Sequence, residues 1–239
     1  MTADWTQAVR QRLAPGRLLP LGGSRDGAWM TERAAASVLG EAAATGVPGA
    51  RLGTLRIGLA DSQDVREPVV PAPPSALWPG PLRVTADFAA TGDRPLPVTA
   101  ERLRTVLTAA AERLGLTVTE VDLRVTDLLE PAAEPAPAAR EQRPPDAERT
   151  TDADEALVAA AVLTVAGVTR LTAAFGDRGH AVRVERRESD AALPHRHVYV
   201  ELATDSEHRA TEVAQRVRAA VRETMEDRPT VAVLVTGVE

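Results

Sequence analysis

The feature that most constrains the fold is a pattern that occurs twice along the 239-residue chain. Residues 82–129 read as a strand, an amphipathic helix and a second strand, and residues 197–239 repeat that order. Upstream of each, an Ala-rich helix closes in a similar motif, VPGARL at 47–52 and VAGVTRL at 165–171. Several elements matching in one order are far more specific than any single match, so the sequence predicts two related modules.

Both predicted modules have the order helix, strand, strand, helix, strand. We expect an N-terminal segment (1–27), a first module (28–129), a linker rich in Pro, Ala and charged residues (130–151) and a second module (152–239). The predicted class is α+β, with two tandem modules that each form a small three-stranded sheet with helices on one face. The two halves share few identities, which indicates either an old duplication or a convergent pattern.

Apolar periodicity supports these elements. Alternation with period two predicts strands, and apolar residues at i, i+4 and i+7 predict helices. Asp152 begins a capping-box pattern, and Gly167 suits the end of the helix that follows it. The predicted inward positions are Leu82, Val84, Ala86, Phe88, Val121, Leu123, Val125, Val198, Val200 and Leu202 on strands, and Leu103, Val106, Leu107, Ala110, Leu114, Val213, Val217, Ala220, Val221 and Met225 on helices.

The opposite face of the second predicted sheet has an unusual composition. It contains the only tyrosine of the chain and a leucine that a solvated strand would not need, beside charged residues, which is typical of a contact surface. Two alternatives bury that leucine: another chain binds the face, or the first module lies across it. The candidate interaction face consists of Arg183, Glu185, His197, Tyr199, Glu201 and Leu234, with Ala232 and Thr236 beside them.

Composition excludes several classes of function. The net charge of −6, with both signs interspersed, argues against nucleic-acid binding. The chain lacks cysteine and lysine, which excludes thiolate chemistry, Cys-ligated zinc and Schiff-base lysines. No signal-like segment and no apolar run of roughly 20 residues is present, so a cytoplasmic location is expected. The absence of Lys and Asn, with Ile57 as the one isoleucine, indicates a high-GC bacterial genome, with an actinobacterium as the first candidate.

The second half resembles the alkaline shock, or envelope stress, family of bacteria. The matching motifs are a helix closing in V-x-G-V (165–168), a V-x-V strand (198–200), the helix pattern E-V-A-x-x-V-x-x-x-V (212–221) and a final V-x-V-x-V-x-G-V strand (231–238). Residues 28–129 match more weakly, mostly in pattern. The resemblance implies a non-enzymatic, cytoplasmic protein that assembles through partner proteins and is tethered to the membrane through one of them.

Other motifs have simpler interpretations. His195 and His197 share a strand face and form the best metal candidate, but no third ligand is evident. The GxxG sequence at 176–179 lies between a helix and a strand, whereas an RNA-binding loop of this kind joins two helices, so a turn is expected. Gly22–Ser24 is read as a turn rather than an anion-binding nest. The apolar stripe of residues 4–13 is expected to pack on the first module rather than on a membrane.

These observations predict a non-enzymatic structural or interaction protein related to the envelope stress response. No catalytic residue, cofactor or metal site is predicted. The expected partner is another protein or a second copy of the chain, and nucleic acid is not expected. The alternative is a regulatory protein that binds a small ligand between two pseudo-symmetric modules.

Overall fold

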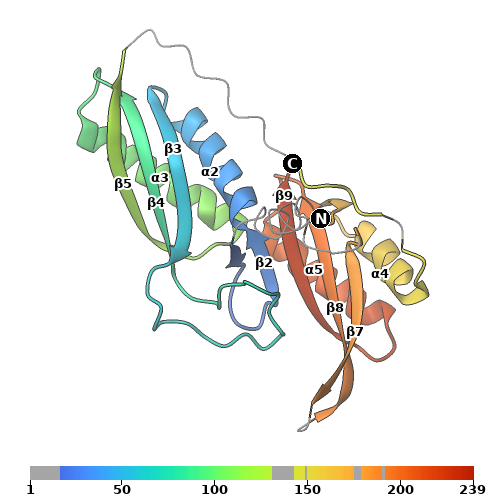
Figure 1. Cartoon of the computed structure of the whole chain (residues 1–239). Helices are drawn as coiled ribbons and strands as arrows, with labels where there is room; N and C mark the ends of the chain where they lie inside the picture. The colour runs from blue at the N-terminus through green and yellow to red at the C-terminus, as the bar shows by residue number, and fades with distance from the viewer. Residues whose placement is uncertain (1–16, 131–142, 149, 175–178, 190–191) are drawn as a thin grey trace, which may run out of the picture.

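The computed structural model describes residues 17–130, 143–148, 150–174, 179–189 and 192–239. In this part of the chain the fold is α+β, with four helices and two mixed sheets of three and six strands (Figure 1). None of the described helices is both long enough and apolar enough to cross a membrane.

The smaller sheet is built from β3 (Ala50–Leu59), β4 (Leu82–Thr91) and β5 (Val118–Leu129), in that order. β3 pairs antiparallel with β4, and β4 pairs parallel with β5. Helices α2 (Glu32–Gly46) and α3 (Leu96–Leu114) pack on it. The predicted inward side chains of β4, from Leu82 to Phe88, are at most 1% exposed, so its period-two pattern is confirmed.

The larger sheet has the order β1 (Leu18–Pro20), β2 (Ala28–Thr31), β9 (Thr230–Val238) and β8 (Ala192–Thr204). On its far side, β8 pairs antiparallel with both β6 (Val168–Leu171) and β7 (Val182–Ser189). β8 and β9 are parallel, joined through α5 (Ala210–Thr224), and α4 (Ala153–Leu163) precedes β6.

The expectation of three strands in the second sheet is wrong. β2 adds to β9 in parallel, and β1 pairs antiparallel with β2, so strands from the first half of the chain extend the sheet. Burial of large apolar side chains favours this addition, because Trp29 and Met30 of β2 and Leu18 and Leu19 of β1 are each at most 1% exposed. The expected first strand is also divided into two, β6 and β7.

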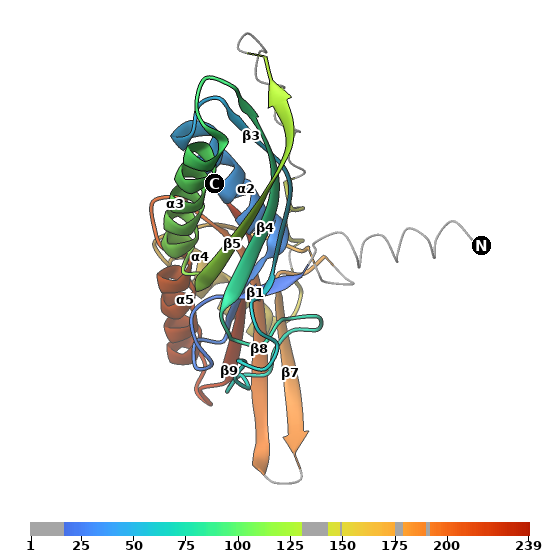
Figure 2. The ribbon, with the colours of Figure 1, turned by 90° about the vertical axis from the view of Figure 1, so that its left-hand side faces the viewer.

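The helices lie on one side of both sheets, as predicted (Figure 2). One apolar core runs beneath them through both halves of the chain. The helix stripes are largely confirmed, since Leu103, Leu107, Val213, Val217 and Val221 are fully buried. The Asp152 side chain caps α4 as expected, accepting hydrogen bonds from the amides of Asp154 and Glu155 at 3.0 Å.

The C-terminus of α3 meets the N-terminus of α5 directly. Thr211 Oγ1 donates to the Leu114 carbonyl at 3.2 Å, and the Arg209 guanidinium donates to the Glu112 carbonyl at 2.9 Å. Gly115 ends α3 with a φ of +90°, and any side chain there would collide with Thr211. A glycine at this position therefore allows the close approach of the two halves.

Candidate interaction surfaces

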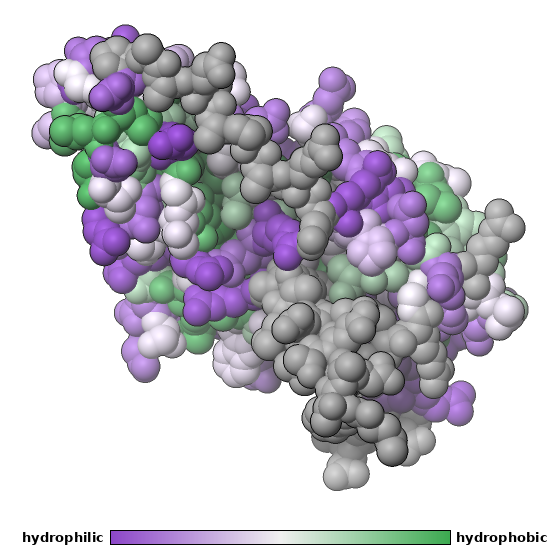
Figure 3. All heavy atoms as spheres, turned by 45° about the horizontal axis from the view of Figure 1, so that its top comes forward, coloured by the Kyte–Doolittle hydropathy of each residue, from purple (hydrophilic) through white to green (hydrophobic). Residues whose placement is uncertain are grey.

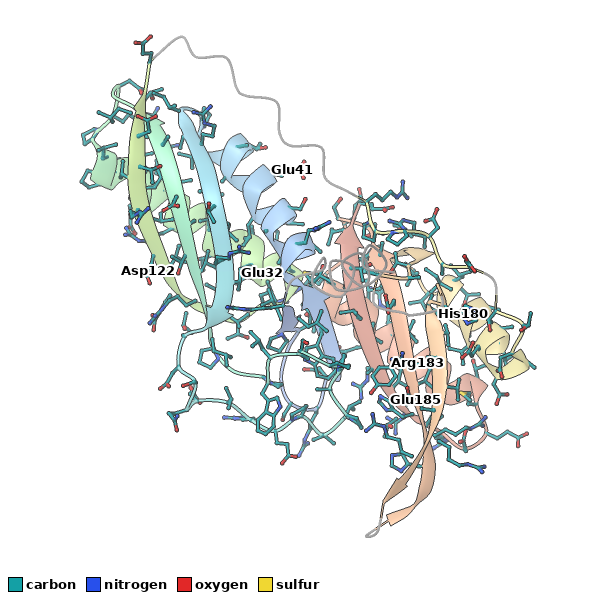
Figure 4. All side chains as sticks on the ribbon, viewed as in Figure 1. Glu32, Glu41, Asp122, His180, Arg183 and Glu185 are labelled. Atoms are coloured by element: carbon teal, nitrogen blue, oxygen red, sulfur yellow. The ribbon has the colours of Figure 1, made fainter. Side chains whose placement is uncertain are left out.

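The strand register places the predicted interaction residues on one face of the larger sheet. Arg183 pairs with Tyr199 and Glu185 with His197, while Glu201 pairs with Leu234. Figure 4 shows Arg183 and Glu185 on β7, on the side of the sheet away from the helices. The strand alternation in the sequence therefore predicted correctly that these residues share one face of the sheet.

Most of that face is covered by the chain itself. A second apolar cluster joins Leu234 and Tyr199 to Trp29 of β2 and to Val70, which belongs to the Pro-rich segment 67–77. Val70 is 4% exposed and Leu234 5%. Of the two alternatives, an intramolecular cover accounts for the burial of Leu234, while binding of another protein to the six-residue face stays a prediction.

Two hydrogen bonds from the ends of the Pro-rich segment fix it in place. The Val69 amide donates to the Ser24 carbonyl, and the Leu77 amide donates to the Leu18 carbonyl, both at 2.9 Å. The indole Nε1 of Trp29 donates to the Leu77 carbonyl at 3.2 Å. The segment is therefore part of the folded structure rather than a solvated loop.

Toward β7 the face becomes polar. The Arg183 guanidinium carbon lies 4.8 Å from the centre of the Tyr199 ring, and Arg187 donates to the Tyr199 hydroxyl at 2.8 Å. The Glu185 carboxylate forms an ion pair with the Arg183 guanidinium, with a distance of 3.0 Å between Oε1 and Nε. The side chains of Arg183 and Glu185 are well exposed, which leaves this part of the candidate face accessible to a partner.

His197 is fully buried beside this cluster. Its Nδ1 lies 2.7 Å from Thr230 Oγ1, and its ring meets the Tyr199 ring edge-on at 4.3 Å. Burial, followed by the positive charges of Arg187, His195 and Arg183, lowers the pKa of His197 to about 4. The imidazole is therefore neutral at pH 7.

The structure does not gather a metal site around the candidate histidines. In the described residues, no group of three or more His, Asp, Glu or Cys side chains could hold an ion. His195 is exposed on the same strand face as His197, whose Nδ1 already has Thr230 as its partner. The absence of a bound metal stays a prediction for elemental analysis.

The remaining motifs add no site. The Asp26 carboxylate accepts a hydrogen bond from the Gly23 amide at 2.7 Å. A carboxylate of the chain itself therefore occupies the position that a bound anion would take at the turn Gly22–Ser24. The GxxG sequence at 176–179, apart from its last glycine, and the stripe at 4–13 lie outside the described residues.

One apolar surface was not predicted from the sequence. After its acidic first turn, helix α4 is apolar on every side from Ala156 to Leu163, yet only Val158 and Val162 are buried. Leu157 is 50% exposed and Leu163 53%, and Ala153, Ala156 and Ala160 are also exposed. Figure 3 shows apolar atoms at this side of the molecule. The signal was available, because a helix that is apolar all round is ordinarily buried all round.

An open depression of about 700 Å³ lies between α2 and α3, near the junction with α5. It is shallow and mostly bordered by small side chains, with a few charged groups at the rim. The residues that line it are Ala42, Thr45, Gly46, Val106, Ala109, Glu112, Arg113 and Arg209.

A scan of the chain against models of known protein families finds no match, and a search of curated proteins finds no matching relative. The resemblance to the alkaline shock family therefore stays a prediction made from residues 152–239.

Proposed function

We propose that this chain is a non-enzymatic interaction protein of the envelope stress type, built from two diverged copies of one α/β unit. Residues 32–129 have the order helix, strand, strand, helix, strand, and residues 153–238 follow that order with one additional strand, because both β6 and β7 precede β8. β4 is antiparallel to β3 and parallel to β5, and β8 is likewise antiparallel to β6 and β7 and parallel to β9. This correspondence supports a duplicated module.

The observation that carries the interaction role is the exposed apolar side of α4. Leu157 and Leu163 are each about half exposed, and alanines lie between them along the helix. The side chain of a leucine contributes roughly 1.5–3 kcal/mol when it is fully buried, so exposing two of them has a cost that a partner would remove. The alanines let a partner segment approach the helix backbone closely.

The test is capture of the partner by the full chain from the native host, comparing wild type with the Leu157→Glu/Leu163→Glu variant. The matched control is Val98→Glu, because Val98 is 49% exposed on a different helix. We expect the same protein to co-purify with wild type and with the control, and to be lost from the α4 variant. All three chains should keep the same melting temperature, since none of these side chains is buried. Capture that is identical for the three chains contradicts the proposal.

The alternative function is small-ligand binding in the depression between α2 and α3. Arg113 and Arg209 border it, which favours an anionic ligand. If this is the function, inorganic phosphate or citrate should raise the melting temperature of wild type, and Arg113→Ala should abolish that shift. No shift with any small anion would leave the interaction role as the better assignment.

A further inference from the structure

β5 is an open edge of the smaller sheet. Among the described residues it pairs only with β4, and its side chains Val125 and Leu128 are 40% and 62% exposed, although Val125 was predicted to face inward. The equivalent strand of the other half, β9, has its outer edge covered by β2. A twelve-residue edge strand without such a cover is a ready site for pairing with another strand.

The other edge of the same sheet, β3, is occupied in part by α2. The buried Glu32 carboxylate at the start of α2 accepts a hydrogen bond from the Ile57 amide of β3 at 2.8 Å. Figure 4 shows Glu32 between the two sheets and Asp122 on the opposite, outer side. The β3 edge is therefore occupied at Ile57 by a group of the chain itself.

The outward backbone groups of β5 can be assigned. Arg104 Nε donates to the Val121 carbonyl at 3.3 Å from α3, which places that carbonyl on the outer edge. Because successive residues of a strand point their backbone groups to opposite sides, the amides and carbonyls of Leu123 and Val125 also point outward. Beyond Val125 the register shifts by one residue against β4, so the regular edge spans 121–125.

The charges on this edge favour one partner in one register. When two copies of β5 pair antiparallel about a two-fold axis at Leu123, Asp122 lies opposite Arg124 of the second copy, and this happens twice. Val121 then lies opposite Val125 of the second copy, and the outward groups of all three apolar residues face each other. A two-fold axis at residue 122 or 124 would instead place Asp opposite Asp or Arg opposite Arg.

Few existing interactions of β5 have to be broken for two copies of the strand to pair. The side chains of Arg124 and Asp122 are 77% and 63% exposed, and their present ion pairs with Asp87 and Arg83 are 3.1 and 3.5 Å long. Exposed ion pairs of this kind contribute little to stability, so exchanging them for ion pairs across the two-fold axis costs little free energy. The Arg104 side chain would move away from the Val121 carbonyl.

We propose that β5 is a self-association edge, through which two copies of this chain join their smaller sheets by antiparallel pairing of residues 121–125. The surface is separate from α4, so this inference does not rest on the proposed function. Five residues per strand bury less than the standard interface, so the dimer should be weak, with a Kd on the order of 10–100 µM.

Charge reversal tests the proposal with the full chain in sedimentation-equilibrium experiments, from about 1 µM to about 1 mM protein. Asp122→Arg alone and Arg124→Asp alone should each raise the dimer Kd at least about tenfold, because each creates like-charged pairs across the axis. The double variant Asp122→Arg/Arg124→Asp should dimerise like wild type. An equimolar mixture of the two single variants should form heterodimers, since one then contributes two Arg and the other two Asp.

The matched control is Arg51→Asp, which changes an exposed charge on β3, the strand at the opposite edge of the sheet from β5. It should dimerise like wild type, and melting temperatures should show that all variants are folded. A wild-type chain that stays monomeric at about 1 mM overturns the proposal. Self-association of the single variants with wild-type affinity overturns it as well. A dimer lost in Leu157→Glu/Leu163→Glu but indifferent to the β5 charges would assign self-association to α4 instead.

Discussion

Truncation of Val70 measures how firmly the Pro-rich segment 67–77 is packed on the larger sheet. Val70 is 4% exposed and contacts the cluster formed by Leu18, Trp29 and Leu234, whereas its neighbour Val69 is 70% exposed. Val70→Ala removes two buried methyl groups, each worth about 0.8 kcal/mol on transfer from water, and leaves a small cavity. We expect a loss of about 2 kcal/mol in the free energy of unfolding.

The change should be visible in thermal unfolding followed by circular dichroism. For a chain of this size, 2 kcal/mol corresponds to a fall in Tm of about 4–8 °C. Val69→Ala is the matched control, and it should stay within about 0.5 kcal/mol of wild type because its side chain is in solvent. An unchanged Tm for Val70→Ala, or an equal fall for both variants, would refute the assignment of this segment as the cover of the sheet.

Three further changes probe other parts of the structure. Glu32→Ala should cost about 1–3 kcal/mol in urea unfolding because it leaves a buried strand amide without its acceptor, whereas Glu41→Ala on the exposed side of the same helix should be neutral. Because the folded-state pKa of His197 is depressed, the unfolded chain binds a proton first, so stability should fall by up to about 3 kcal/mol as the pH drops from about 6.5 to about 4. His197→Gln should flatten that pH dependence of Tm and His195→Gln should not; equal profiles for the two variants would contradict the burial of His197. Gly115→Ala should lower Tm by several degrees, since it combines a φ of +90° with a collision at the junction of α3 and α5.

Local periodicity was sufficient to predict most of the secondary structure. The stripe from Val213 to Met225 specified α5 because one helix face must be apolar to pack on a sheet, and the alternation from Leu82 to Phe88 specified β4 for the same reason. The repeat predicted a helix and then strands, a helix and a strand in each half, but it did not show that the second half has two strands, β6 and β7, where the first has only β3. The outward face from Arg183 to Leu234 followed from strand alternation alone.

Tertiary structure decided what covers these faces. No periodicity in residues 18–31 indicates that they extend the larger sheet, because β2 pairs with β9, about two hundred residues further along the chain. Nor does the sequence of 67–77 show that this segment packs on that sheet, because Val70 contacts residues as distant along the chain as Leu18 and Leu234. The same limit applies to edges: a strand pattern in 118–129 shows two faces, but only the assembled sheet shows that β5 is the last strand and that β9 is not. Local sequence determines which residues are apolar enough to favour burial. Long-range packing determines which of them are buried within the chain and which, such as Leu157 and Leu128, stay exposed.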